Sequence, residues 1–476
     1  MSKVITPRHE DPARWYTDVV IRSELADYSP VKGCMVIRPL GYALWERIQA
    51  HLDARFKETG HRNAYFPLFI PESFLKREKA HVEGFSPELA VVTIGGGKEL
   101  EERLVVRPTS ETIIYSMFSK WIRSYRDLPL LLNQWSNVVR WEMRTRLFLR
   151  TTEFLWQEGH TAHASEKEAE EETLKILDLY HDFAHQQMAL PVLKGLKSER
   201  EKFAGALRTY CIEALMQDGK ALQAGTSHNL GQNFSKVFDV KFQNQEGGTD
   251  FVWQTSWGVS TRLVGALVLA HGDDQGLILP PALAPTQVVV VPIWKNDEEK
   301  SKIKQTLQTL LASIPSSLRV EVDAREEVSP GFKFNEWEMK GVPLRLELGP
   351  RDVAQGKAIA VSRLDRRKEP VPLDSLGVAL PELLAKIQSA LYERALAFRN
   401  SNTRPAVTYA EFREQVETLG GFFEAFWCGN PDCEIRIKEE TKATIRCIPL
   451  ENQGAEGACL LCGSLSRTRV VLARAY

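Results

Sequence analysis

The sequence predicts a multidomain α/β protein with an antiparallel-sheet domain flanked by helices, a small α/β domain and a C-terminal α+β domain that binds metal. Three observations support this prediction. The 476 residues are too many for one hydrophobic core. A proline-rich break at residues 280–285 separates stretches of different patterning. Four of the seven cysteines lie in two close pairs near the C-terminus. We therefore expect domains at residues 1–284, 285–400 and 401–476.

The composition is that of an ordinary soluble globular protein, with 43% hydrophobic and 26% charged residues. The net charge of −1 excludes a bulk polycation, so an RNA partner would have to be bound by local patches. The first residues lack the apolar core of a signal peptide, and no run of eighteen apolar residues occurs. We expect a cytoplasmic protein without a membrane partner, whose reduced cysteines hold metal where they cluster.

Helices and strands alternate over the first seventy residues. Residues 11–28 have the pattern of an amphipathic helix, and residues 33–39 that of a short strand. Between residues 40 and 59 apolar residues recur at every fourth position, which predicts a long helix that ends before Gly60. These apolar residues are Leu44, Ile48, Leu52 and Phe56. A strand that closes on Pro71 should follow.

Two short segments between residues 91 and 112 allow alternative interpretations. Three glycines, residues 95–97, could form a phosphate loop, but no Lys-Ser/Thr pair and no helix follow them. We therefore favour the tip of a hairpin. In the segment RPTSET, residues 107–112, the pattern of Ser110 or Thr109 with Glu111 before an apolar run could be only a helix N-cap.

A charged hairpin is predicted between residues 138 and 160. Two β-rich runs, one up to Met143 and one from Thr152, flank a short basic loop. The simplest interpretation is a surface hairpin that carries many charged residues.

The spacing of the charged residues in this hairpin suits a bent nucleotide. Arg140 and Glu142 lie two apart and would project from one face of the first strand. Arg150 and Phe154 add a second cation and an aromatic ring. Such a set offers cations for phosphates, a carboxylate for an amino group and a ring for stacking.

The connector after the hairpin is short and predicted to be helical. Residues 166–188 form an acidic, solvated helix face. Residues 199–217 predict a second helix that ends near Gly219. A connector of roughly sixty residues leaves no room for a further domain of ordinary size.

The segment of residues 221–242 is the next dense motif. Gly225 and Gly231 allow a ligand to approach the backbone closely. Gln223, Thr226 and His228 could all face that ligand, although a lone histidine is often structural.

A strand, a turn and an apolar helix that starts near Gly258 follow this segment. Ser260 and Arg262 lie at the helix start. An arginine in the first turn opposes the helix dipole, a cost that makes sense if a phosphate lies there.

Beyond residue 285, strands alternate with helices over roughly 100 residues, which predicts a small α/β domain with a mixed or parallel sheet. The tail then presents C-x4-C and C-x2-C, separated by twenty-five residues. Four thiolates at this spacing fit a closed, structural zinc site, although Cys447 could replace one ligand. The expected ligands are Cys428, Cys433, Cys459 and Cys462.

These motifs resemble those of the class II aminoacyl-tRNA synthetases. The helix and strand of residues 40–71 resemble motif 1, the hairpin of residues 138–160 resembles motif 2, and the segment that ends at Arg262 resembles motif 3. The Thr-Ser-Glu of residues 109–111, the segment 221–242 and the cysteine-rich tail are similar to those of the prolyl-tRNA synthetase family, in the type without an editing insertion.

The resemblance implies a class II catalytic domain, an anticodon-binding domain and a zinc-binding domain, which together charge tRNA(Pro) with L-proline. It also implies ATP and Mg²⁺ as cofactors and a homodimer formed through motif 1. Thr109, Glu111, Arg140 and His228 would bind proline, and Arg140 and Arg262 would be catalytic. The residues implied for ATP are Arg140, Glu142, Arg150, Thr151, Phe154, Gln223, Thr226, Ser260 and Arg262. Candidates for reading the anticodon are Glu338, Arg345, Arg351 and Arg367.

Two alternatives stay open at this point. Another class IIa synthetase would share the three motifs, but a threonyl enzyme would need a cysteine and two histidines that grip zinc in the catalytic region. A catalytically inactive, synthetase-like regulatory or RNA-binding protein usually loses the phosphate-binding arginines. Here Arg140, Arg150 and Arg262 are all present.

Overall fold

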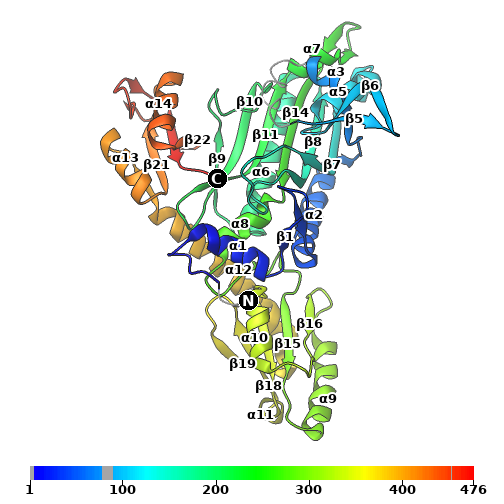
Figure 1. Cartoon of the computed structure of the whole chain (residues 1–476), viewed down its shortest axis with the longest axis vertical. Helices are drawn as coiled ribbons and strands as arrows, with labels where there is room; N and C mark the ends of the chain where they lie inside the picture. The colour runs from blue at the N-terminus through cyan, green and yellow to red at the C-terminus, as the bar shows by residue number, and fades with distance from the viewer. Residues whose placement is uncertain (1–4, 78–88, 452) are drawn as a thin grey trace.

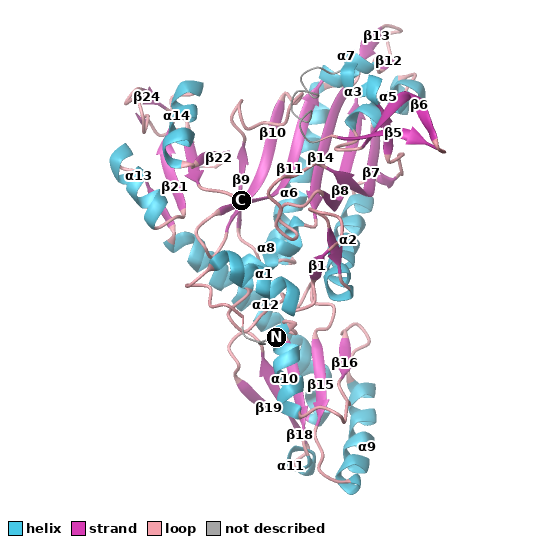
Figure 2. Ribbon diagram, viewed as in Figure 1, coloured by secondary structure: helices cyan, strands magenta, loops and turns pink. Residues whose placement is uncertain are grey.

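The computed structural model describes residues 5–77, 89–451 and 453–476. Its main feature is one continuous sheet in the order β20-β21-β25-β22-β9-β10-β11-β14-β8-β7-β3 (Figures 1 and 2). Neighbouring strands are antiparallel, except for the parallel pairs β20–β21 and β3–β7 at the two edges. The N-terminal strands are β3 (Arg62–Asn63), β7 (Leu130–Val139), β8 (Glu153–His163), β14 (Trp253–Ser260), β11 (Ala221–Gly231), β10 (Arg208–Leu215) and β9 (Val192–Leu196).

Among the residues that the structure describes, four helices pack in the layer on one face of this sheet. They are α1 (Pro12–Arg22), α2 (Pro39–Glu58), α6 (Glu166–Gln186) and α8 (Arg262–His271). Ile176 and Tyr180 of α6 pack against apolar strand residues such as Ile212 and Trp257 in the largest core of the molecule. Full burial of each large apolar side chain contributes about 1.5 to 3 kcal/mol. The opposite face of the sheet carries the polar groups described below, beside a smaller apolar cluster that includes Tyr115 and Phe234.

Smaller elements surround the sheet. They are β1 (Ala26–Tyr28), β2 (Met35–Ile37), β4 (Phe69–Pro71), α3 (Glu72–Arg77), β5 (Ala90–Gly95), β6 (Lys98–Val106), α5 (Glu111–Trp121), η2 (Tyr125–Asp127), α7 (Asn233–Phe238), β12 (Lys241–Gln243) and β13 (Thr249–Phe251). The predicted hairpin tip is confirmed, since Gly95 pairs with Lys98 and both Gly96 and Gly97 have positive φ. The predicted helix of residues 40–59 and the strand ending at Pro71 are confirmed as α2 and β4.

Two predicted helices differ from the structure. The helix expected over residues 11–28 ends at Arg22, because Glu24 adopts a left-handed φ of 65° and the chain then enters β1. The helix expected over residues 199–217 is wrong, since residues 208–215 form β10. Gly219, interpreted as the end of a helix, forms the turn between β10 and β11 with φ 76°. The pair Asp218-Gly219 in a short connection between two strands is typical of a β-hairpin, and this pattern favours the observed structure.

A second, mixed sheet in the order β16-β15-β17-β18-β19 lies below the first in Figure 1 and confirms the predicted small α/β arrangement. Its strands are β15 (Val288–Pro292), β16 (Val320–Val322), β17 (Leu344–Leu348), β18 (Lys357–Ser362) and β19 (Lys368–Pro372). The associated helices are α9 (Asp297–Ser313), α10 (Pro330–Met339), α11 (Pro350–Ala354), η3 (Leu373–Ser375) and the long α12 (Leu376–Ser401).

The C-terminal part is joined to the main sheet. Its elements are β20 (Thr403–Pro405), α13 (Tyr409–Thr418), β21 (Phe422–Phe426), α14 (Pro431–Thr441), β22 (Thr444–Pro449), β23 (Gly457–Ala458), β24 (Leu465–Ser466) and β25 (Arg469–Ala473). Strand β22 pairs with β9, and Arg446 of β22 forms a buried ion pair of 3.0 Å with Glu213 of β10. Lys197 binds the same carboxylate at 2.7 Å. No helix within the described ranges is long and apolar enough to cross a membrane.

Candidate active site

Three neighbouring strands form the floor of the candidate active site. Strands β8, β14 and β11 are paired so that their residues lie opposite one another in rows across the sheet. Two such rows are Thr226–Gly258–Glu158 and His228–Ser256–His160. Side chains in one row project from the same face of a sheet. The register therefore gathers polar groups from three distant parts of the chain onto the face opposite the largest core.

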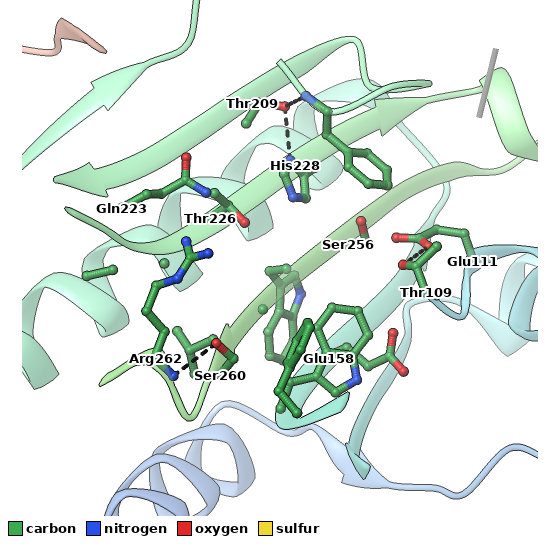
Figure 3. Close-up of a pocket in the computed structure, with 18 of the residues that line it drawn as sticks. Thr109, Glu111, Glu158, Thr209, Gln223, Thr226, His228, Ser256, Ser260 and Arg262 are labelled. Atoms are coloured by element: carbon green, nitrogen blue, oxygen red, sulfur yellow. Dashed lines mark hydrogen bonds between the residues drawn. The ribbon is translucent and has the colours of Figure 1, made fainter. Parts of the chain in front are cut away.

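A cavity of about 280 Å³ lies over this floor (Figure 3). Its lining includes the predicted residues Thr109, Glu111, Arg140, Phe154, Gln223, Thr226, His228, Ser260 and Arg262. A second cavity, of about 150 Å³, is lined by Arg140, Glu142, Phe148, Leu149, Arg150, Thr151, Phe154, Ser260 and Arg262. Every residue predicted to bind proline or ATP lines at least one of the two cavities. Four residues line both: Arg140, Phe154, Ser260 and Arg262.

Glu111 and Thr109 mark one end of the larger cavity, at the start of α5 (Figure 3). Both are buried, and the Thr109 hydroxyl donates to the Glu111 carboxylate. Ser110 occupies the N-cap position, but its hydroxyl makes no capping hydrogen bond and instead donates to Glu158. The side chains of this segment are thus turned toward the cavity floor and toward each other, which a mere helix cap would not require.

A buried polar network lies beneath this end. Glu158 accepts hydrogen bonds from Ser110 and from Gln134, the latter at 2.8 Å. The His160 Nε2 atom lies 2.9 Å from the second carboxylate oxygen of Glu158, and His160 Nδ1 lies 3.2 Å from the Tyr115 hydroxyl. Because buried polar networks that are satisfied in this way are rigid, the network fixes the position of the acidic end.

His228 is held in one orientation by Thr209. The Thr209 hydroxyl accepts from the Phe203 backbone N–H at 3.0 Å, so its own proton is available to the Nδ1 atom of His228, 2.9 Å away (Figure 3). The Phe203 ring lies against the imidazole, with centroids 4.7 Å apart. Burial lowers the pKa of His228 to about 4, so the ring is neutral at pH 7. A neutral ring that accepts at Nδ1 carries its proton on Nε2 and can donate from there.

Three guanidinium groups gather at the other end. Arg140 lies over the rings of Phe154 and Trp156, at 5.5 and 5.6 Å from their centroids, and its Nε donates to the Pro108 carbonyl. Arg262 donates to the Leu149 carbonyl at 3.3 Å. Burial, followed by repulsion from Arg140 and Arg150, lowers the pKa of Arg262 to about 10. The side chain is still charged at pH 7, and a cluster of like charges favours an anionic ligand.

The hairpin differs from the sequence prediction at its tip. Strand β7 ends at Val139 and β8 begins at Glu153, so Arg140 and Glu142 follow the strand and do not share a strand face. Glu142 accepts from the backbone N–H of Arg144 at 2.9 Å, a local turn that competes with strand pairing. Its other oxygen lies 3.4 Å from Arg150, so the two are still brought together across the loop.

Comparisons with known proteins show the family of the chain. The family model "tRNA synthetase class II core domain (G, H, P, S and T)" matches residues 92–271, "Anticodon binding domain" matches residues 287–383, and "Prolyl-tRNA synthetase, C-terminal" matches residues 409–476. The "Proline--tRNA ligase" of Roseiflexus sp. (strain RS-1) is 58% identical over 478 residues, covering 99% of each chain. The chain belongs to the prolyl-tRNA synthetase family.

Other members of the prolyl-tRNA synthetase family agree over the whole length. The "Proline--tRNA ligase" of Chloroherpeton thalassium is 57% identical over 485 residues, covering 100% of both chains. A solved prolyl-tRNA synthetase from Cryptosporidium parvum, complexed with halofuginone and AMPPNP, superposes with a TM-score of 0.94 at 41% identity, covering 100% of both chains. The predicted class II fold, with its antiparallel sheet, is confirmed.

In the anticodon-binding part of this synthetase, the structure brings together two of the four predicted residues. Arg345 donates to Glu338 at 3.0 Å and to Glu347 at 3.0 Å, and its guanidinium lies 4.1 Å from the centroid of the Phe334 ring. Lys368 approaches Glu347 to 3.1 Å.

The other two candidates lie elsewhere on this domain. Arg351 is exposed on α11. Arg367 is exposed and lines a separate cavity with Leu344 and Lys386. Arg367 precedes β19, whereas its neighbour Lys368 is the first residue of that strand and approaches Glu347.

The four predicted cysteines of the synthetase tail form one cluster. Their Sγ atoms all lie within 4.8 Å of one another, and Cys428 is 3.7 Å from both Cys433 and Cys462. A tetrahedral site with bonds of about 2.3 Å needs sulfur–sulfur distances of about 3.8 Å. The donor set therefore fits a metal ion. Cys447 is excluded as a substitute ligand, since it is buried beside Cys211 in a different cluster.

Several lining residues were missed by sequence reasoning. Glu158 and His160 lie in β8 and form part of the cavity floor, and Phe203 and Thr209 lie within residues 199–217, which were interpreted as a helix. The available signal for Glu158 and His160 was their spacing of two residues in a predicted strand, which places both on one face.

Proposed function

We propose that the chain is a proline–tRNA ligase, which activates L-proline with ATP to prolyl-adenylate and transfers the prolyl group to the 3′ end of tRNA(Pro) in the cytoplasm. One observation carries the proposal. Arg140 and Arg262 line both cavities, so an occupant of one meets an occupant of the other between two guanidinium groups. A carboxylate and a triphosphate are the pair of ligands that such a junction suits.

The larger cavity suits proline. At its acidic end, the Glu111 carboxylate and the Thr109 hydroxyl offer a charge and an acceptor to a secondary ammonium group. Arg140 would orient the proline carboxylate toward the nucleotide. His228, neutral and with its Nε2 proton free of Thr209, contributes a polar contact to the wall.

The smaller cavity and the adjoining floor suit ATP. Arg150 and Arg262 would bind phosphates, Phe154 would stack on the adenine, and Glu142 would accept from an amino group. The remaining predicted contacts are Thr151, Gln223, Thr226 and Ser260.

The chemistry follows from alignment and charge. An oxygen of the proline carboxylate attacks the α-phosphorus of ATP, the bond from that phosphorus to the bridging oxygen breaks, and pyrophosphate leaves. A carboxylate is already a nucleophile, so no general base is required. The guanidinium groups of Arg140 and Arg262 stabilise the charge that develops on the phosphate oxygens. In the second step a hydroxyl oxygen of the terminal ribose of tRNA attacks the prolyl carbonyl carbon, the bond from that carbon to the phosphate oxygen breaks, and AMP leaves with the hydroxyl proton.

The residues present also fit Mg²⁺ and zinc. Gln223 provides an oxygen atom beside the guanidinium groups of Arg140 and Arg262, and Mg²⁺ commonly takes one or two protein ligands in addition to phosphates. When bound with the nucleotide, Mg²⁺ would neutralise part of the phosphate charge. The four cysteines would hold a structural zinc ion, because a site closed by four thiolates leaves no open position for chemistry.

The anticodon of tRNA(Pro) would be read around Arg345. Arginine can bind guanine through O6 and N7, and a carboxylate such as Glu338 can accept from guanine amino groups. Release of Arg345 from Glu338 and Glu347 would present both kinds of group to the base. Arg351 and Arg367 remain candidates for weaker contacts.

A homodimer is supported by exposed apolar side chains around motif 1. Tyr28 and Val31 are each 61% exposed, Val36 is 49% exposed and Tyr42 is 44% exposed. Apolar residues gathered in one region of a surface mark an interaction site. Sedimentation equilibrium should give a dimer for the native chain and a weaker one for Val36→Asp. A monomeric native chain would contradict the dimer.

Exchange of radiolabelled pyrophosphate into ATP tests the activation step. Proline should stimulate the exchange, whereas threonine and glycine should not. Glu111→Gln should raise the KM for proline more than the KM for ATP, because it removes a charge from the acidic end only. Exchange that is independent of proline, or absent, would reject the proposed function.

A further inference from the structure

A loop from the main sheet and a helix from the C-terminal part meet behind the larger cavity. We call residues 198–207 the wall loop; it connects β9 to β10. Two of its side chains, Glu201 and Phe203, line the larger cavity. The Phe203 ring lies against His228, and its backbone N–H is bound to Thr209. The wall loop therefore forms part of the side of the cavity nearest His228.

The outer side of the wall loop is bound by α14. The Ser198 hydroxyl donates to the Glu434 carboxylate at 2.6 Å, and these residues are only 2% and 4% exposed. One helical turn further on, Lys438 lies 3.1 Å from Glu201. Residues four apart lie on one face of a helix, so a single face of α14 holds the loop at two points.

The two contacts differ in strength. The Lys438–Glu201 pair is largely exposed on the lysine side, and such pairs contribute little. The bond from Ser198 to a carboxylate is short and shielded from water, and loss of either partner leaves a buried polar group unsatisfied. Glu434 should therefore be the dominant contact.

We propose that Glu434, assisted by Lys438, is a positioning residue that sets the affinity for the amino acid by holding the wall loop in place. The inference rests on the proposed function, since it assumes that proline occupies the larger cavity. The nine residues that line the smaller cavity all lie outside the wall loop. Displacement of the loop should therefore weaken proline binding and leave ATP binding nearly unchanged.

The kinetic test compares Glu434→Ala, Ser198→Ala and the double variant in pyrophosphate exchange. Each single variant should raise the KM for proline about tenfold, equivalent to about 1.4 kcal/mol. The double variant should raise it no further, because both changes break one contact. The KM for ATP and kcat should stay within about threefold of the native values. Glu434→Gln keeps an acceptor oxygen for Ser198 and should restore most of the affinity.

The matched control is Glu439→Ala, an exposed carboxylate on the same helix. It should leave all three kinetic constants unchanged. Equal increases in the KM for proline and for ATP, or no increase in Glu434→Ala, would overturn the proposal.

Limited trypsin digestion provides a readout that does not depend on catalysis. Arg200 and Lys202 lie within the wall loop, so cleavage after them reports how well the loop is held. Cleavage should be several-fold faster in Glu434→Ala and Ser198→Ala than in the native chain or Glu439→Ala. If proline failed to stimulate exchange in the native chain, the proposed function would fail while the digestion still tested the contact. Equal cleavage rates in all variants would refute the positioning role.

Discussion

Replacement of Arg262 by glutamine should lower the rate of proline activation and raise the stability of the unliganded protein. Arg262 starts α8, lines both cavities and faces Arg140 and Arg150. Removal of one preorganised group that stabilises developing charge typically lowers kcat by about 10²–10³, or roughly 3 to 4 kcal/mol. We expect a loss in this range for Arg262→Gln, because only one of the two remaining arginines, Arg140, lines both cavities.

The unliganded protein should become more stable when Arg262 is replaced by glutamine. Burial and repulsion lower the pKa of Arg262 from 12.5 to about 10, which corresponds to a cost of roughly 3 kcal/mol for keeping the charge. Loss of its hydrogen bond to the Leu149 carbonyl should cost about 1.5 kcal/mol. The free energy of unfolding of Arg262→Gln should therefore rise by roughly 1 to 2 kcal/mol.

The assay pairs proline-dependent pyrophosphate exchange with urea denaturation in the absence of ligands. Arg123→Gln is the control, since Arg123 is exposed and lines neither cavity. An exchange rate within threefold of the native rate would refute the role of Arg262 in phosphate binding. A loss of several kcal/mol of stability would refute the electrostatic account of the cluster.

Four further predictions follow from other parts of the molecule. Burial lowers the pKa of both His228 and His271 to about 4, below the usual 6.5, so the unfolded chain binds more protons between these values. The free energy of unfolding in urea should therefore fall by roughly 2 kcal/mol for each histidine between pH 7.5 and pH 5, and a flat profile would contradict this. Metal analysis should find one zinc per chain, and Cys433→Ser or Cys459→Ser should release it and lower the Tm by about 5 °C or more; an unchanged Tm would count against a structural site. The purified chain should activate alanine measurably, because a pocket for a ring discriminates weakly against smaller side chains, and it should not hydrolyse preformed alanyl-tRNA; rapid hydrolysis would refute this. Arg345→Gln should lower kcat/KM for tRNA by about 10- to 100-fold without changing pyrophosphate exchange, and an equal loss in both assays would exclude anticodon reading.

The sequence was sufficient for the parts of the site that depend on local spacing. The Thr-Ser-Glu segment, the hairpin arginines and Arg262 were all located from short motifs, and the two cavities bring them together. Strand register is a tertiary property, so the rows that add Glu158 and His160 to the floor were not predictable from one segment.

The errors have physical causes. Strand β10 was interpreted as a helix because Gly219 resembled a helix end, whereas pairing with β9 and β11 decides its conformation. The C-terminal part, predicted as a domain from residue 401, continues the main sheet through β22, and this continuity could not be predicted. A backbone pairing such as that of Ile448 with Leu196 leaves no mark in composition or periodicity.

The shared sheet makes the tail inseparable from the catalytic half. If residues 401–476 were deleted, the backbone groups of β9 that now bind β22 would become an open edge, and such edges recruit other chains. Shortened versions should therefore fail through self-association before their catalytic defects can be measured.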